Sequence, residues 1–264
     1  MFTPLSTNSK TLLATLFTCL FAAPSFADDA QTQAEQEEIG FWGTWKSSAE
    51  ASIIVTSGNT STTTLRGKID ARQELTDWNN QYVFDSLFKR EETTNADGEQ
   101  ENRRSAERYF LSAQGNYKLE TEHSFLLLYA AHLEDKFGSF RSNTIVSGGY
   151  GYRLLNSEEH TIDAEIGPGY RYGEKDSGEE VKGMIVRASG VYAWKISDSA
   201  NFEQKLSVET GSGNTFTKSE SYISAKLNGS LRMKFGFVVS HNSNVDVGKE
   251  NTDTETTMTL VYQF

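Results

Sequence analysis

Cysteine, proline and long apolar runs are all scarce in this sequence of 264 residues. The single cysteine, Cys19, lies in an N-terminal segment that we expect to be removed during export, so the mature chain has no thiol for a disulfide or a thiolate metal site. The one proline beyond that segment, Pro168, stands inside an otherwise alternating stretch. Because proline removes a ladder hydrogen bond, we expect a bulge or a bend at Gly167-Pro168-Gly169.

The apolar run from Thr11 to Ala23 is too short for a helix that crosses a bilayer, which needs roughly 20 apolar residues, and no later stretch approaches that length. The run follows Lys10 and precedes Ser25-Phe26-Ala27, a small-x-small cleavage site. These features predict a secretory signal peptide at residues 1–27 and exclude a helical inner-membrane protein. We expect residues 28–41 to form an acidic periplasmic tail.

An excess of positive charge is also lacking, since 25 Lys and Arg face 36 Asp and Glu, a net charge of -11. Nucleic acid is therefore not expected as a partner, because polyanions bind to basic patches. The mean hydropathy of -0.52 is typical of a soluble protein. In a transmembrane barrel, however, only every second strand residue meets lipid, so the average hides such a membrane signal.

The last eleven residues, 254–264, alternate strictly between an apolar and a mostly polar face. A strand in lipid must have both edges paired, so the rest of the chain has to supply its partners. The apolar face ends in Leu260, Tyr262 and Phe264 and resembles the closing strand of bacterial outer-membrane barrels. The resemblance implies that these three residues act as an assembly signal and that the barrel-assembly machinery is a partner.

From Trp42 onward the sequence falls into about twelve alternating segments. In the second segment, Leu65 and Ile69 alternate with Arg66, Lys68 and Arg72. A Lys or Arg facing hydrocarbon at mid-depth costs roughly 2 to 4 kcal/mol, so such charges must face an enclosed interior. The residues expected to line this lumen are Arg66, Lys68, Asp70, Arg72, Asp85, Arg104, Arg108, Glu165, Arg171, Arg187, Lys205 and Glu209.

The connections between the segments also alternate in length. Those near residues 76, 121, 157, 198 and 233 are short, whereas those at 91–101, 135–142, 174–180, 211–219 and 243–253 are longer. Short periplasmic turns and longer external loops are typical of outer-membrane barrels. The sequence therefore predicts that residues 42–264 form a twelve-stranded antiparallel transmembrane β-barrel in the outer membrane, in contact with its lipid and lipopolysaccharide. A soluble β-sandwich would not explain charged and aromatic residues on opposite faces of consecutive strands.

Two segments are less regular than the rest. In the fifth, Phe125, Leu127, Tyr129, Ala131 and Leu133 share one face. The tenth is expected at Tyr222 to Leu231, after the loop at 211–219.

Short motifs from Trp45 to Phe264 resemble the YdiY-like family of salt-induced outer-membrane proteins, a bacterial domain of unknown function. They are Ser57-Gly58-Asn59-Thr60, Ala106-Glu107-Arg108-Tyr109, Asp135-Lys136-Phe137, Gly149-Tyr150-Gly151-Tyr152-Arg153, Gly167-Pro168-Gly169-Tyr170-Arg171 and Thr252-Asp253-Thr254 leading to Tyr262-Gln263-Phe264. The resemblance implies a barrel and an outer-membrane location. It implies no established activity and no catalytic residues.

The sequence favours a protein that is not an enzyme, either a narrow channel for small solutes or a component that supports envelope integrity under salt stress. Opposite charges across a lumen of this width either plug it or leave a thin polar path. The alternative is a hydrolase of phospholipid or lipopolysaccharide acyl esters that uses His241 and Ser243 on the lipid-facing side. The other histidines lack metal-ligand spacing, and neither a metal nor a cofactor is expected.

Overall fold

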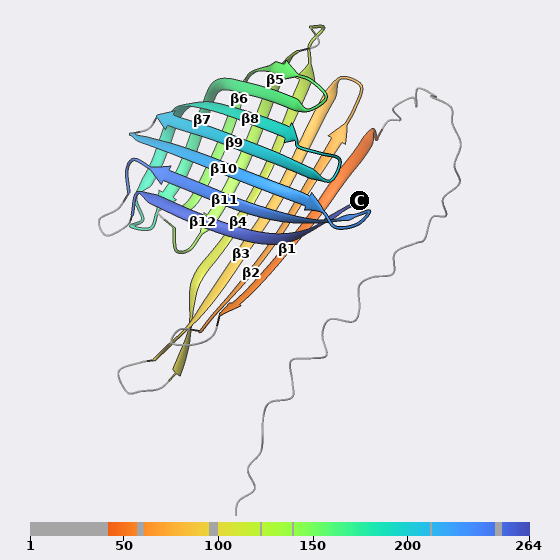
Figure 1. The fold of residues 1–264 in the computed structure, drawn as a ribbon. Coiled ribbons are helices and arrows are strands. Elements are labelled where there is room, and N and C mark those ends of the chain that lie inside the picture. Colours follow the sequence, from red (N-terminus) through yellow and green to blue (C-terminus); the bar gives the residue numbers. More distant parts are fainter. Residues whose placement is uncertain are drawn as a thin grey trace, which may run out of the picture. The chain divides into compact units, whose positions relative to one another are not determined.

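In a computed structural model of the chain, the barrel is described at residues 42–56, 61–94, 100–121, 123–138, 140–211, 213–245 and 250–264. The expected signal peptide and acidic tail lie outside these residues. Twelve strands form one closed barrel in which each strand pairs with its neighbours in sequence and β1 pairs with β12 (Figure 1). The predicted fold class is therefore confirmed. Among the described residues there is no helix of the length and apolarity that crossing a bilayer requires.

All strand pairs are antiparallel. The strands are β1 (Thr44–Thr56), β2 (Ser61–Glu74), β3 (Trp78–Thr94), β4 (Gln100–Lys118), β5 (Ser124–Asp135), β6 (Phe140–Asn156), β7 (His160–Lys175), β8 (Glu180–Lys195), β9 (Ala200–Gly211), β10 (Asn214–Lys226), β11 (Leu231–Asn242) and β12 (Thr252–Gln263).

The barrel closes between its first and last strands. Ser48 lies opposite Gln263, and the register continues to Ala51 opposite Leu260. Beyond these pairs, Ser47 and Phe264 exchange two backbone hydrogen bonds of 2.9 Å. The ladder at this seam is short, since it ends at Ala51 and Leu260, and beyond it the Ser52 hydroxyl donates to the Met258 carbonyl at 3.1 Å. The first and last strands thus close the barrel through their periplasmic halves.

The outer surface of the barrel is an apolar belt to which every strand contributes. Exposed side chains, one from each strand, are Ile53, Leu65, Phe84, Leu111, Leu128, Val146, Ile166, Val186, Leu206, Ile223, Phe235 and Met258. Aromatic residues mark the periplasmic border of the belt, where the rings of Trp78 and Tyr117 contact each other and His160 stacks on Trp194. A closed sheet with this surface spans the outer membrane, and aromatic girdles at the interface are part of that architecture.

Strand β5 is apolar on both faces. Leu126 and Leu128 are exposed on the outer face, whereas Leu127 is buried. Tyr129 lies opposite Gln114 of β4, so the two side chains share a face of the sheet. The Gln114 amide donates a hydrogen bond to Glu165 of β7, past the two strands β5 and β6, and this is possible only through the interior of the barrel. The face that carries Phe125, Leu127, Tyr129, Ala131 and Leu133 is thus the inner one.

Two local predictions were wrong. Strand β10 begins at Asn214, inside the predicted loop 211–219, and the turn before β11 occupies residues 227–230 rather than the vicinity of 233. Of the bulge or bend predicted at Pro168, the bulge is absent, because the pairing of Ser147 with Gly169 and of Tyr150 with Ile166 keeps one register on both sides of it, although the ladder is interrupted between these two pairs. The irregularities of the β6–β7 pair lie instead near its ends, at Phe140/Ser142 and Arg153/Leu155.

Candidate functional site

The interior of the barrel holds a network of charged side chains. Period-two alternation directs them inward, and in this network they pair with one another rather than with solvent. The side chains of Asp85, Arg171 and Glu209 are less than 11% exposed, which excludes a wide aqueous channel around them.

One cluster connects strands that are not neighbours. The guanidinium of Arg66 on β2 donates to Asp85 Oδ2 of β3 from Nη2 at 2.8 Å and from Nε at 3.0 Å, and also bonds Glu255 of β12. Arg108 on β4 donates from Nη2 to Glu255 Oε2 at 3.1 Å. Three strands separate β4 from β12 in the sheet, so the contact between Arg108 and Glu255 passes through the interior.

A second cluster centres on Glu50 of β1. Its carboxylate accepts a hydrogen bond from Lys234 of β11 and lies 3.8 Å from Nζ of Lys68 on β2. The Lys234 ammonium is also 4.6 Å from the centre of the Tyr222 ring on β10, a favourable cation–π geometry. The Tyr222 hydroxyl in turn donates to Glu220 Oε1 at 2.9 Å.

The wall formed by β7 to β9 carries a third group of charges. Glu165 accepts hydrogen bonds from Gln114 at 2.7 Å, from Ser189 at 2.8 Å and from Arg187 at 3.4 Å. The Arg187 guanidinium lies 4.1 Å from the centre of the Tyr129 ring. Nearby in the same sheet, Arg171 Nη2 donates to Glu209 Oε2 at 2.7 Å.

The remaining predicted lumen residues lie toward the periplasmic end, with one exception. Asp70 accepts from Gln81 Nε2 at 2.9 Å and lies 3.4 Å from Arg72 Nε, and Lys205 is 3.1 Å from Glu203.

Arg104 is the exception. The register of the β3–β4 pair shifts between Lys89 and Arg90, so that Arg104 lies opposite Arg90. Arg104 therefore points outward, as Arg90 does, and not inward as the alternation of β4 predicts. Its guanidinium bonds Glu107, which lies on the same face as the outward Tyr109. The prediction that Arg104 lines the lumen is not supported by this geometry.

Several interior residues were not among those predicted. Glu50 and Glu255 complete two of the clusters. Both alternate with the apolar residues of their strands in the sequence, so the period-two pattern alone would have placed them among the lumen residues. Tyr129 and Tyr222 contribute aromatic rings to the interior. A rule that assigns every aromatic residue to lipid misses them.

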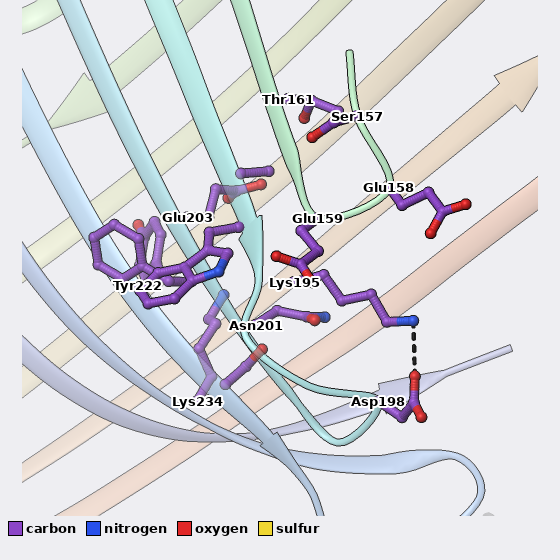
Figure 2. A pocket seen from close by; sticks show the side chains of 14 residues that line it. Ser157, Glu158, Glu159, Thr161, Lys195, Asp198, Asn201, Glu203, Tyr222 and Lys234 are labelled. Atoms are coloured by element: carbon purple, nitrogen blue, oxygen red, sulfur yellow. Dashed lines mark ion pairs between the residues drawn. The ribbon is translucent and has the colours of Figure 1, made fainter. Parts of the chain in front are cut away.

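A pocket of about 510 Å³ opens at the periplasmic end of the barrel. Glu203, Tyr222 and Lys234 line its inner part, and Lys195 and Asp198 lie at its edge (Figure 2). Lys195 Nζ is 2.7 Å from Asp198 Oδ1. This hydrogen bond and the positive charge lower the pKa of the Asp198 carboxyl below its usual value.

The alternative hydrolytic pair does not assemble. His241 Nδ1 is 2.9 Å from the Thr252 hydroxyl, whereas the Ser243 hydroxyl donates to Asn214 Oδ1 at 3.0 Å and accepts from the Thr215 N–H at 2.8 Å. A serine whose hydroxyl is committed to two other partners is not activated by the imidazole. Among the described residues, no group of three His, Cys, Asp or Glu side chains could hold a metal ion.

Comparison with known proteins gives one family and several distant barrels. The family described as "Protein of unknown function, DUF481" matches residues 49–264. The uncharacterized protein YdiY of Escherichia coli (strain K12) is 29% identical over 248 residues, which cover 94% of this chain and 93% of YdiY.

Two solved structures match at low identity. The NanC porin is 8% identical, with a TM-score of 0.47 over 83% of this chain and 98% of its own. The COG4313 outer membrane channel from Pseudomonas putida F1 is 10% identical, with a TM-score of 0.47 over 83% of this chain and 94% of its own. Likenesses of this size assign no solute and no activity.

Proposed function

Because the chain belongs to DUF481, a family of proteins of unknown function, we propose its function from the barrel itself: a narrow outer-membrane channel for small polar solutes. A barrel of twelve strands encloses more space than one of eight, which side chains fill, and less than a wide porin of sixteen. The proposed path runs through a polar interior whose narrowest part is formed by ion pairs.

The contact between Arg108 and Glu255 carries the proposal. It connects β4 to β12, across the three strands between them in the wall, at 3.1 Å, and it is made by long side chains of opposite charge rather than by a packed apolar core. Such side chains change rotamer without unfolding the sheet, so the constriction has a way to widen and to select by charge. The periplasmic pocket supplies one entrance to this interior.

Planar-bilayer conductance of the refolded mature protein tests the proposal. We expect small, discrete conductance steps, and larger steps in the double variant Arg108→Ala, Glu255→Ala, because both side chains then leave the constriction. Lys182→Ala is the matched control, since Lys182 is an exposed residue paired with Glu180. Current steps in neither the wild type nor the double variant would contradict the channel and favour the second candidate.

The second candidate is a sealed barrel that supports envelope integrity. The low exposure of Asp85, Arg171 and Glu209 favours it, since a dry, paired interior conducts nothing. A deletion strain that loses resistance to detergent or osmotic challenge, rescued by a protein without conductance, would support this candidate over the channel.

A further inference from the structure

Two arginines face each other directly on the outer surface of the barrel, near the external ends of β3 and β4, which are the two strands of the protruding hairpin at the lower left of Figure 1. Arg90 lies opposite Arg104 in the ladder, and both are exposed. Like charges directly opposite in a sheet destabilise it. An anion that binds both guanidinium groups would remove this cost.

The surrounding residues add a third cation and hold two of the three in place. Glu107, only 5% exposed, bonds Arg104 and accepts a hydrogen bond from Lys136 Nζ at 2.6 Å. The backbone N–H of Lys136 also donates to the Glu107 carbonyl at 3.1 Å. Within the described part of the chain, the Arg90 guanidinium has no hydrogen-bond or ion-pair partner.

A recess of about 290 Å³ lies beside Arg90. Its lining consists of Thr63, Arg90, Glu92 and Asn102. The register places Thr63 and Asn102 on the same outward face as Arg90 and Arg104. The recess thus offers an amide and a hydroxyl next to the free guanidinium, with Glu92 as the carboxylate of its lining, in addition to Glu107 beside Arg104.

The depth of this cluster matches the headgroup region of the outer leaflet. On the outward face of β3, Trp78 and Phe88 are ten residues apart, which is about 34 Å along a strand and about 24 Å across the bilayer at a tilt of about 45°. The apolar band of a barrel is about 25 Å tall, so Phe88 marks its outer border. The Phe88 ring packs against Tyr109 at 5.4 Å, and Arg90 follows two residues beyond Phe88.

We propose that Arg90, Arg104 and Lys136 form a binding site for the phosphate groups of a glycolipid in the outer leaflet. Arginine binds phosphate through two parallel hydrogen bonds, and lysine binds it as a point charge. The acyl chains of such a lipid would lie along the apolar belt below, over Phe88, Tyr109 and Leu111. The positive charge of the three side chains matches the phosphate groups of such a lipid, and their position at the border of the apolar belt matches its headgroup. A soluble anion would use only the charges and not the apolar surface beside them.

The test measures binding of purified bisphosphorylated lipid A to the full mature protein, refolded in detergent, by native mass spectrometry. We expect one tightly bound lipid in the wild type and at least about tenfold weaker binding in the double variant Arg90→Gln, Arg104→Gln, since the variant loses the charge-assisted hydrogen bonds to phosphate. Lipid A that lacks both phosphates should bind to the wild type and to this variant with equal affinity, because it has no group that the two arginines would bind.

Lys182→Gln is the matched control, because it removes a cation of β8 that already pairs with Glu180 at 3.2 Å, and it should bind as the wild type does. The variant Arg90→Lys, Arg104→Lys keeps the charge and should retain part of the affinity, which separates lost charge from lost folding. Equal affinity of the wild type and the Gln variant would overturn the proposal. Displacement of the lipid by an equal concentration of inorganic phosphate would also overturn it, in favour of a free-anion site.

Discussion

The ion pair between Arg171 and Glu209 is the most deeply buried charge pair described in the barrel, with side chains 1% and 10% exposed. Two further guanidinium atoms, Nε and Nη1, have no partner among the described residues. Neutralising Glu209 would leave a buried charge with almost no compensation. We therefore expect Glu209→Gln to reduce the free energy of unfolding by about 3 to 5 kcal/mol, measured by guanidinium unfolding of the protein refolded into lipid vesicles.

Asp163→Asn provides the control for this prediction. Asp163 accepts two hydrogen bonds from Arg153, at 2.7 Å and 3.0 Å, but the side chains are 27% and 41% exposed. A pair with this access to solvent contributes up to about 1 kcal/mol. Equal losses in the two variants would show that burial does not set the energy of these pairs.

At the scale of the strand, the sequence predicts best where one face is charged and the other apolar. Strand β2 meets this condition, and the predicted alternation of Leu65 and Ile69 with charged residues lies within the observed strand, Ser61–Glu74. Strand β10 does not, because Thr215, Thr217, Ser219 and Ser221 occupy its outward face and resemble a loop in composition. Gln204 of β9 donates to Ser219 at 3.0 Å and accepts from Ser221, which satisfies its amide on this face. Only pairing with the neighbouring strands identifies the segment as a strand.

Strands β6 and β7 approach each other unusually closely beside Pro168. A Cβ atom on Gly167 would lie 2.2 Å from the Gly148 carbonyl oxygen and 2.5 Å from the Gly149 Cα. The two backbones therefore approach closely beside the proline, and the absence of side chains permits it.

Gly167→Ala should consequently force β6 and β7 apart, since backbone atoms cannot rotate away from the added methyl. We expect a loss of about 1 to 3 kcal/mol in the free energy of unfolding, as for other overpacked sites, measured as for Glu209→Gln. Gly190→Ala is the control, because its Cβ would meet only the Asp163 carbonyl oxygen at 3.7 Å. A Gly167→Ala protein as stable as Gly190→Ala would disprove the close approach.

For the whole molecule, the sequence predicts strand number, closure and location, because these follow from alternation and from the requirement that no edge remain open in lipid. The contacts inside the barrel do not follow from the sequence in the same way. Whether Arg108 meets Glu255 depends on the registers of the four strand pairs that connect β4 to β12. A single bulge in the β3–β4 pair is enough to turn Arg104 outward. Small register errors accumulate around a closed sheet, so cross-lumen partners require the structure.

Closure itself gives the last prediction. Phe264 makes two backbone hydrogen bonds of 2.9 Å with Ser47, while its ring stacks on Tyr262 at 5.8 Å on the outer surface. Net hydrogen bonds contribute about 0.5 to 1.5 kcal/mol each, so deleting Phe264 should lower the stability of the refolded barrel only modestly. If Leu260, Tyr262 and Phe264 also act as the assembly signal, the same deletion should strongly reduce the amount of protein that reaches the outer membrane in cells.

The measurement compares two quantities for the Phe264 deletion: the heat-modifiable folded band in outer-membrane fractions and the unfolding free energy in vesicles. Met258→Ala removes an exposed apolar side chain of the same strand outside the proposed signal and should leave the cellular amount near that of the wild type. A deletion that changes both quantities in proportion would mean that Phe264 acts only through the seam. If the three residues act as the assembly signal, a large cellular loss with a small change in vesicle stability is expected instead, because the side chain of Phe264 would then be needed for assembly and not only for the seam.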